Sequence, residues 1–332
     1  MTADPDVDPG AGAAVELAVI CVTYRSRELA PTAIHSARVA AQSAGLSCEI
    51  IVVDNASDDG TADAVATAVP EAIVIRNTAN VGFGAANNQA FKVARGRWWV
   101  LLNPDASLDP DAVTRLTEAM SADARLAVAG PSVAGAGMGG AESAGMLPGI
   151  RSLAGHFLFV NRILPPGRGG GWRGFQVRPG VGQHRQEVEW ISAAAALVRP
   201  EAIRAIGGFD ASIFLYGEDL DLSARLVAAG WRLAIVPRAR ATHAIGGSQG
   251  PSSTRWLDGL HTFLVRRGVP RWKRSIDFAI VSLGLGLRAA AAVVVPGDDA
   301  RVAHRRRMRA GAMRAMAIAI SGTSARGPGA NR

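Results

Sequence analysis

The chain has 332 residues, of which 48% are hydrophobic and 19% charged, and its formal net charge is +8. This length and hydrophobic content suffice for a large buried core, built as one large α/β domain or as one domain with an appendage. The two cysteines, Cys21 and Cys48, lie in or beside apolar strand-like runs. We interpret them as small buried apolar residues, which excludes a disulfide-stapled protein and suits a reducing compartment.

Residues 1–14 are acidic and rich in proline and glycine, with no basic head and no apolar stretch. This composition predicts a disordered lead-in rather than a signal peptide. We therefore expect the protein in the cytoplasm.

Predicted strands and helices alternate up to Leu102. Short apolar runs rich in valine and isoleucine predict buried strands, and alanine-rich segments with apolar spacing near 3.6 predict helices. Such alternation predicts parallel strands joined by right-handed crossovers. The segments are a strand at Leu17–Tyr24, a helix at Leu29–Gly45, a strand at Glu49–Asp54, a polar turn at Asn55–Gly60, a helix at Thr61–Val69, a strand at Ala72–Arg76, a helix at Gly84–Arg95 and a strand at Trp98–Leu102.

Polar residues recur where these strands end. Thr23 closes the first strand, Asp54 the second, and Asn103-Pro104-Asp105 follows the fourth. Sites in parallel sheets lie beyond the carboxyl ends of the strands, and carboxylates there can bind a nucleobase, ribose hydroxyls or a cation bridging two phosphates. These residues also favour turns, but their recurrence at equivalent strand ends favours a site.

The glycine pattern argues against two common nucleotide-binding folds. No G-x-G-x-x-G joins the first strand to its helix, and no P-loop lysine motif is present. Gly82-Phe83-Gly84 precedes a helix but follows the third strand. A nicotinamide enzyme and a P-loop phosphotransferase are therefore disfavoured.

An acidic cluster begins a helix farther along the chain. Glu218, Asp219 and Asp221 occupy the first turn of a segment with helical apolar spacing that ends at Gly230. The helix dipole favours negative charge there, yet three carboxylates exceed what a helix start requires. One of them, aimed into the crevice, can act as a general base.

His243 follows an apolar strand-like run at Leu233–Val236 and precedes the glycine-rich turn Gly246-Gly247-Ser248. A lone histidine is often a structural residue. The neighbouring glycine-rich amides favour a role as a metal ligand or a phosphate contact instead.

The basic excess sits mainly after Arg255, in a region that could face nucleic acid or an anionic membrane. Trp256 and Trp272 lie among these charges, beside the strongly apolar stretch Ile276–Pro296. The stretch can lie on a membrane, span it, or form an ordinary buried helix pair. Asp277 and Arg288 within it argue against spanning, and the flanking tryptophans favour surface association.

The chain resembles inverting glycosyltransferases of family 2, which have the nucleotide-binding GT-A fold. It is most similar to bacterial rhamnosyltransferases acting on lipid-linked intermediates in cell-wall or polysaccharide biosynthesis. The matching stretches cover about residues 17 to 250 in the family's order. They are VICVTY, IIVVDNASDDGT, NTANVGFGAANNQA, WWVLLNPDA, WISAAAALVRPEAIRAIGGFD, FLYGEDLDLSARLVAAGW and HAIGGS.

The resemblance implies a role for each matching residue, and Mg²⁺ or Mn²⁺ as cofactor. It implies a catalytic pair, in which Asp219 is the general base and Glu218 its neighbour. Asn103 stands where the family's D-x-D motif has its first aspartate. The remaining roles are nucleotide binding by Thr23, Asp54, Asn80, Gly82 and Asn103, metal binding by Asp105 and His243, and a border of the acceptor site at Trp190.

The resemblance also implies a mostly parallel, Rossmann-like central sheet flanked by helices, with a helical basic and apolar extension. We expect a lead-in at 1–14, a catalytic domain at 15–250, a membrane-associating extension at 251–320 and a disordered tail at 321–332. The implied reaction moves a sugar, L-rhamnose from dTDP-rhamnose, to a polyprenyl-diphosphate-linked saccharide at the inner face of the cytoplasmic membrane. The alternatives are another hexosyl- or galactofuranosyltransferase and a non-catalytic nucleotide-binding module.

Overall fold

The computed structural model describes residues 15–135, 144–163, 173–177, 184–244, 254–294 and 299–323. The predicted lead-in over residues 1–14 lies outside the described residues, as does the predicted tail from residue 324 onward.

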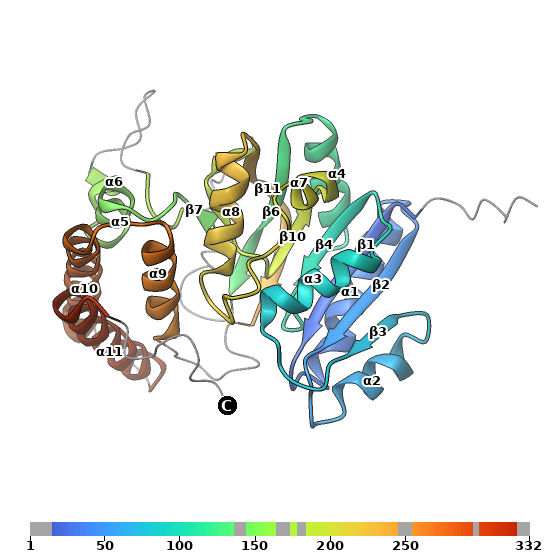
Figure 1. Ribbon diagram of the computed structural model, residues 1–332, viewed down its shortest axis with the longest axis horizontal. Helices are drawn as coiled ribbons and strands as arrows, with labels where there is room; N and C mark the ends of the chain where they lie inside the picture. Colours follow the sequence, from blue (N-terminus) through green and yellow to red (C-terminus); the bar gives the residue numbers. More distant parts are fainter. Residues whose placement is uncertain are drawn as a thin grey trace, which may run out of the picture.

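The first half of the sheet has the predicted alternation of strands and helices (Figure 1). Four strands run parallel in the order β3-β2-β1-β4, and the β1–β2 register pairs Thr23 with Asp54. Every residue of β1 and β4 is buried, because both faces of this sheet carry helices. The elements are β1 (Leu17–Thr23), α1 (Leu29–Ser43), β2 (Cys48–Asp54), α2 (Thr61–Ala68), β3 (Ile73–Arg76), α3 (Phe83–Val93) and β4 (Trp98–Leu102).

The second half of the sheet is assembled from segments distant in the chain. Strand β10 is antiparallel to both β4 and β6, and β11 runs parallel to β6. A short strand, β5, pairs antiparallel with the end of β11, which sets His243 opposite Ala106. The elements are β5 (Ala106–Leu108), α4 (Ala112–Ser121), β6 (Leu126–Gly135), β7 (Ala144–Gly145), β8 (Gln186–Val188), β9 (Trp190–Ile191), β10 (Ala195–Val198), α7 (Pro200–Ala205), α8 (Glu218–Ala228) and β11 (Arg232–His243).

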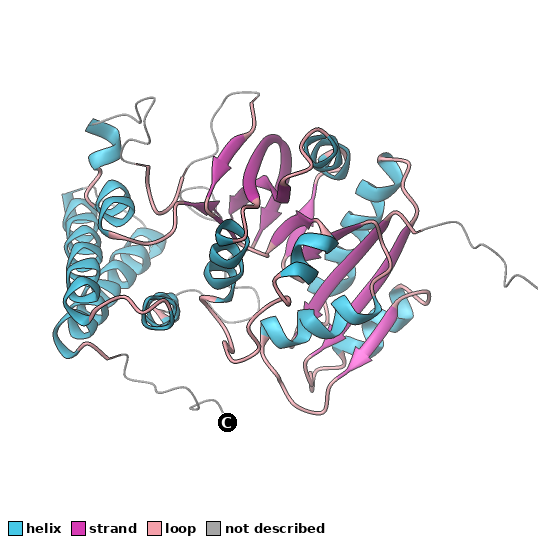
Figure 2. Cartoon of the chain, turned by 45° about the horizontal axis from the view of Figure 1, so that its top comes forward, coloured by secondary structure: helices cyan, strands magenta, loops and turns pink. Residues whose placement is uncertain are grey.

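Helices lie on both faces of the sheet (Figure 2), and a hydrophobic cluster fills each of the two interfaces. One contains the buried alanines of α1 and the apolar face of α4. The other contains buried residues of α3, α7 and α8. Both cysteines are free: Cys21 is buried as predicted, but Cys48 is exposed at the start of β2, so the prediction of a buried residue is wrong there.

A third hydrophobic cluster holds together a group of helices that lies beside α8 (Figure 1). Helices α10 and α11 pack antiparallel, since Ser282 Oγ donates to the Ala312 carbonyl and Arg271 donates to that of Ser321. Arg288 of α10 donates to backbone carbonyls of α5, so residues near 150–157 join this group. The helices are α5 (Ile150–Phe157), α6 (Val160–Ile163), α9 (Arg255–Arg266), α10 (Arg271–Val294) and α11 (Asp299–Ser321). Within the described residues, no helix combines the length and the hydropathy needed to cross a bilayer.

Candidate active site

The ends of β1 and β2 form a closed polar corner. The Asp54 carboxylate accepts hydrogen bonds from the Thr23 hydroxyl (2.9 Å), the Ser57 hydroxyl (2.6 Å) and the Ser57 N–H (3.0 Å). Thr23 is fully buried and Asp54 is 4% exposed. A carboxylate accepts about four hydrogen bonds, so roughly one position remains for a ligand. The predicted nucleotide contacts at Thr23 and Asp54 therefore lie together, and the hydrogen bonds from Thr23 and Ser57 orient the Asp54 carboxylate.

The segment before α3 lies next to this corner. The Asn55 side chain donates to the Gly82 carbonyl at 3.3 Å, and Asn80 Oδ1 accepts from the Gly82 N–H at 3.0 Å. Gly82 has a φ of +89°, and a Cβ there would approach the Phe214 carbonyl oxygen to 2.6 Å. Only glycine fits this close approach. Two further predicted nucleotide contacts, Asn80 and Gly82, thus adjoin Asp54.

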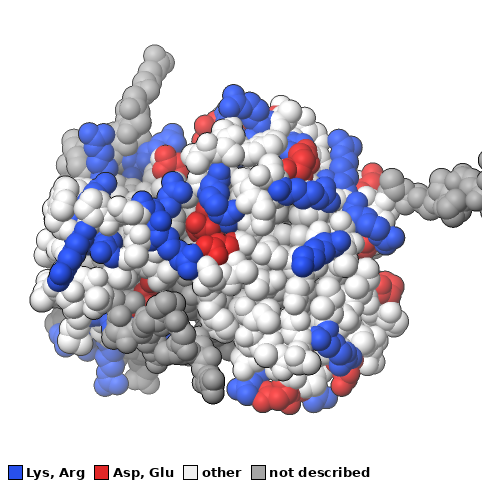
Figure 3. Space-filling model, viewed as in Figure 1, with Lys and Arg blue, Asp and Glu red and all other residues white. Residues whose placement is uncertain are grey.

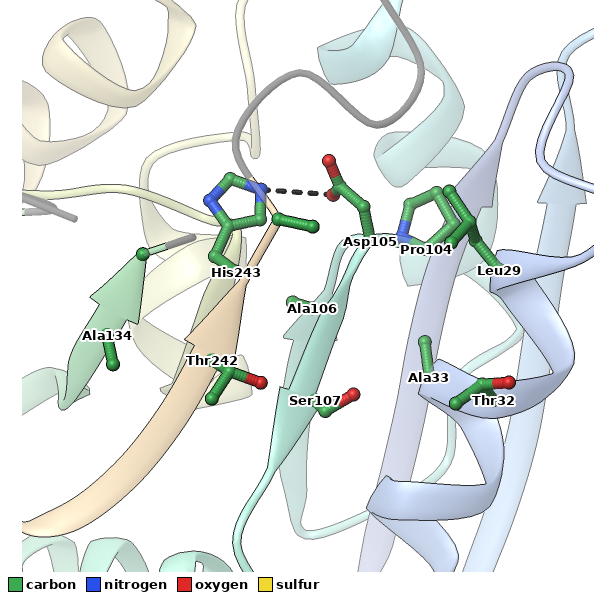
Figure 4. Close-up of a pocket in the computed structure, with 12 residues that line it drawn as sticks. Leu29, Thr32, Ala33, Pro104, Asp105, Ala106, Ser107, Ala134, Thr242 and His243 are labelled. Carbon is green, nitrogen blue, oxygen red and sulfur yellow. Dashed lines mark hydrogen bonds and ion pairs between the residues drawn. The ribbon is translucent and has the colours of Figure 1, made fainter. Parts of the chain in front are cut away.

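Asp105 and His243 meet at the other side of the strand ends. Asp105 Oδ1 lies 3.0 Å from His243 Nε2, and the Ala244 N–H donates to the Asp105 carbonyl at 2.9 Å. The antiparallel β5–β11 pairing fixes this contact between residues far apart in the chain. In Figure 4 the two side chains point toward each other, Asp105 from the loop after β4 and His243 from the end of β11.

A cavity of about 390 Å³ opens beside this pair, between the start of α1 and the ends of β5, β6 and β11. Its walls carry apolar groups from Leu29 and Pro104, and hydroxyls from Ser107 and Thr242 on paired strands (Figure 4). The lining residues are Leu29, Thr32, Ala33, Pro104, Asp105, Ala106, Ser107, Ala134, Gly135, Thr242, His243 and Ala244.

The Asp105–His243 pair can supply part of a divalent-cation site. Within the described residues, no group of three or more acidic, histidine or cysteine side chains forms a complete metal cage. Mg²⁺ and Mn²⁺ prefer oxygen ligands and commonly complete their shell with substrate phosphates and water. One carboxylate and one imidazole therefore fit a cation shared with a diphosphate. Asn103 adds a buried Oδ1 that has no hydrogen-bond partner among the described residues. The glycine-rich turn at 246–248, expected to meet a phosphate, lies outside the described residues.

The acidic cluster begins α8, as predicted. Tyr216 (φ 65°) and Gly217 (φ 94°) both adopt left-handed conformations, which turn the chain sharply into the helix. Asp221 is held in an ion pair by Arg225 at 2.8 Å, which leaves Glu218 and Asp219 for other roles. The Ala193 N–H and the Ser192 hydroxyl lie near the Asp219 carboxylate and lower its pKa.

Burial raises the pKa of both remaining acids. It raises the pKa of Asp219 to about 6, against the nearby Ala193 N–H and Ser192 hydroxyl, which favour its ionised form. Burial, and then the nearby charge of Asp219, raise the pKa of Glu218 well above its usual range. With a pKa of about 6, Asp219 is largely ionised at neutral pH. Glu218 Oε2 and Asp219 Oδ1 are buried without partners among the described residues.

Residues 192–194 lie between the acids at the start of α8 and the segment that carries Asp105. Ser192 and Ala193 lie near Asp219 and lower its pKa, and the carbonyl of the adjacent Ala194 accepts from the Asn103 N–H at 2.8 Å. Asn103 in turn lies two residues before Asp105. Residues 192–194 thus lie between Asp219 and the segment that carries Asp105.

Trp190 lies in the core. It is 7% exposed, its indole N–H donates to the Phe175 carbonyl at 2.8 Å, and its ring stacks on Phe175 with centroids 5.3 Å apart. A border of the acceptor site at this position would act through the neighbouring residues 191–193, since the side chain itself presents little surface.

The loop before α8 has supports that sequence reasoning did not identify. Asn88 of α3 pairs with both backbone groups of Phe209, at 2.8 and 2.9 Å. On the other side, Arg266 of α9 donates to Asp210 at 2.6 Å, and Gly259 of α9 packs against Tyr216. The strings NNQA and GGFD carry this contact, but only the fold shows that they meet.

Comparison with known proteins supports the chain's relationship to sugar-transferring enzymes. Residues 18–167 match the family model described as Glycosyl transferase family 2. The chain is 28% identical over 251 residues to the Mycobacterium tuberculosis N-acetylglucosaminyl-diphospho-decaprenol L-rhamnosyltransferase, covering 70% of this chain and 79% of that protein. It is 43% identical over 56 residues to the Escherichia coli K12 rhamnosyltransferase WbbL, covering 17% of this chain and 21% of that protein.

A solved structure has a similar fold. The crystal structure of GalNAc-T7 with UDP, GalNAc and Mn²⁺ superposes with a TM-score of 0.56 at 14% identity, covering 94% of this chain and 58% of that one. At this identity the likeness concerns the fold alone, which is the expected GT-A arrangement with a C-terminal helical region. The sequence match, the relatives and the fold agree, and residues 18–167 of the chain carry a glycosyl transferase family 2 domain.

Proposed function

We propose that this family 2 glycosyltransferase is inverting and metal-dependent, and that it moves L-rhamnose from dTDP-rhamnose to a polyprenyl-diphosphate-linked saccharide. The observation that carries the reaction type is the position of residues 192–194, between Asp219 and the segment that carries Asn103 and the Asp105–His243 pair. An ionisable carboxylate and a diphosphate-binding pair at one edge of the sheet suit a direct displacement.

In this mechanism Asp219 removes the proton from the acceptor hydroxyl as its oxygen attacks the anomeric carbon. The nearby Ser192 hydroxyl and Ala193 N–H favour the ionised form of this carboxylate. The bond to the leaving diphosphate breaks on the opposite side, so the configuration at the anomeric carbon inverts. Glu218, buried beside the base with a raised pKa, orients the acceptor hydroxyl.

The donor lies along Thr23, Asp54, Asn80 and Gly82, with Asn103 offering its unpartnered oxygen to a hydroxyl. Asp105 and His243 would hold Mg²⁺ or Mn²⁺, which when bound neutralises charge on the diphosphate.

The sugar and acceptor rest on the relatives. The mycobacterial relative is named for L-rhamnosyl transfer to an N-acetylglucosaminyl-diphospho-decaprenol, and the match covers 70% of this chain. A lipid-linked acceptor of that kind is reached at the inner face of the cytoplasmic membrane, where we expect the protein to be peripherally associated.

The test is a panel of nucleoside-diphosphate sugars, with release of the nucleoside diphosphate followed with and without Mg²⁺ or Mn²⁺. The proposal predicts metal-dependent release that is fastest with dTDP-rhamnose. Release only with another sugar would overturn the rhamnose assignment. Binding of donors with no release, in the presence of polyprenyl-linked saccharides, would leave a non-catalytic nucleotide-binding module.

A further inference from the structure

Two adjacent helices expose an unusual amount of apolar surface. On α10 the exposed large side chains are Trp272 (65% exposed), Ile276, Leu283 (55%) and Leu287, at spacings of four, seven and four residues. That spacing places them along one face of the helix. On α11 Met313 (68%), Met316 and Ile320 (73%) repeat at spacings of three and four.

Both stripes lie on the same side of the α10–α11 pair. The other faces of α10 are occupied, because Ser282 bonds α11 and a Cβ on Gly284 would meet Phe157 of α5. On α11, a Cβ on Gly311 would meet Leu285 of α10, and Arg314 pairs with Asp258 of α9. The stripes therefore project from the side that faces away from α5 and α9. We call these seven residues the outer face.

Cations flank the outer face at both ends. Arg271 and Lys273 lie at the start of α10, beside the end of α11. Arg305, Arg306 and Arg309 lie in the first half of α11. In the next turn of this helix, Gly311 packs against Leu285 of α10. Of the side chains described on the two helices, the one acidic group is Asp277, which is fully buried. Figure 3 shows white surface bordered by blue at this end of the molecule.

The geometry points to an anionic lipid surface as the occupant of the outer face, with both helices lying along the membrane plane. A helix that is apolar on one side and basic at its borders lies at the interface, with its apolar side chains in the lipid and its cations at the phosphates. A second copy of the chain fits poorly, because the same cations would oppose one another across the contact. Nucleic acid would meet the cations but leave the apolar stripe without a partner.

This inference rests on the proposed function for its purpose, since a lipid-linked acceptor is reached from a membrane. The same helices also reach the catalytic loop. Asp258 of α9 pairs with Arg314 of α11, and Arg266 of α9 binds Asp210 ahead of α8. The outer face would hold the acid-bearing start of α8 at a fixed orientation to the bilayer.

The experiment is co-sedimentation of the full chain with vesicles of phosphatidylcholine alone and with added phosphatidylglycerol. The inference predicts binding to the anionic vesicles that weakens as salt rises. The double variant Leu283→Gln/Leu287→Gln should lose about a hundredfold in binding, at about tenfold for each buried leucine. Arg305→Gln/Arg309→Gln should lose about twentyfold or more, at about fivefold per cation near an anionic surface.

Matched controls lie at the sheet end of the molecule. Ile73→Gln/Val93→Gln changes two apolar residues that are 38% and 40% exposed, and Lys92→Gln/Arg97→Gln removes two exposed cations. Both control pairs should bind vesicles as the wild type does. All four variants should keep the thermal stability of the wild type, because surface substitutions cost little.

Three results would overturn the inference. They are vesicle binding that is equal for neutral and anionic lipid, vesicle binding that the Leu283/Leu287 variant retains in full, and wild-type self-association that this variant abolishes while vesicle binding persists. Donor hydrolysis in solution separates this inference from the proposed function. Hydrolysis without vesicle binding contradicts the outer face alone, and vesicle binding without any sugar transfer contradicts the proposed function alone.

Discussion

Replacing Glu218 and Asp219, the two acids at the start of α8, one at a time should lower kcat to very different extents. Asp219 has a pKa of about 6 and is largely ionised at pH 7, whereas burial and then the Asp219 charge raise the pKa of Glu218 well above its usual range. Asp219→Asn removes the base and should lower kcat by about 10²–10⁴-fold. Glu218→Gln leaves the base in place and puts an amide of similar shape beside it, so kcat should fall by less than about tenfold.

The pKa of Asp219 sets how far kcat should fall at acidic pH. With a pKa of about 6, roughly one Asp219 in eleven is ionised at pH 5, so kcat should be about tenfold below its plateau there. The assay is the initial rate of nucleoside diphosphate release at saturating donor and acceptor between pH 5 and pH 8. The Glu218→Gln variant should keep the acid limb. A Glu218→Gln variant as inactive as Asp219→Asn, or a rate that is flat down to pH 5, would refute this division of roles.

Two further changes test the supports of the site and the charge state of the helical group. Gly217→Ala adds a side chain at φ +94° that would lie 2.8 Å from the Gly259 carbonyl oxygen, whereas Gly45→Ala at φ +68° meets nothing within 4 Å. Chemical denaturation should show that Gly45→Ala lowers the unfolding free energy by about 1–2 kcal/mol and that Gly217→Ala lowers it further. Of the two variants, Gly217→Ala alone should also slow turnover. Equal losses of unfolding free energy would contradict the close contact between Gly217 and Gly259. Asp277 is fully buried with neither oxygen partnered among the described residues, and burial raises its pKa from 3.8 to about 6. Since the folded protein favours the neutral carboxyl, the stability that Asp277 contributes is present below pH 4 and is lost as pH rises through 6. Asp277→Asn should therefore add up to about 3 kcal/mol to the unfolding free energy at pH 8 and little at pH 4. A variant whose gain in unfolding free energy is the same at both pH values would contradict the unpaired carboxylate.

Local pattern was sufficient for the first half of the fold. Runs such as Leu17–Thr23 and Trp98–Leu102 are short, apolar and buried throughout, and glycines and aspartates mark the turns between them. The helix start at Glu218 was likewise predictable, because the acids and the apolar spacing lie within a few residues of each other. These features depend on neighbours in the chain, so the sequence alone carries them.

Long-range pairing was not predictable in the same way. Strand β10 inserts antiparallel between β4 and β6, and β11 runs to His243, well beyond the Leu233–Val236 run that predicted it. The contact of Asp105 with His243 depends on that extension and on the β5 pairing. The burial of Trp190 follows from packing against Phe175, and a tryptophan next to a predicted site gives no local sign of it. Membrane spanning by Ile276–Pro296 was left open by composition, and the structure resolves α10 as one partner of a packed helix pair.

The central claim is that one edge of the sheet holds the diphosphate at Asp105 and His243 and the base at Asp219. Calorimetric titration of UDP and dTDP into the wild type, Asp105→Ala and Asp219→Asn, each with and without Mn²⁺, tests it most directly. The account predicts that Mn²⁺ tightens nucleotide binding in the wild type and in Asp219→Asn but not in Asp105→Ala. An Asp105→Ala variant that retains the full Mn²⁺-dependent gain in affinity would contradict it.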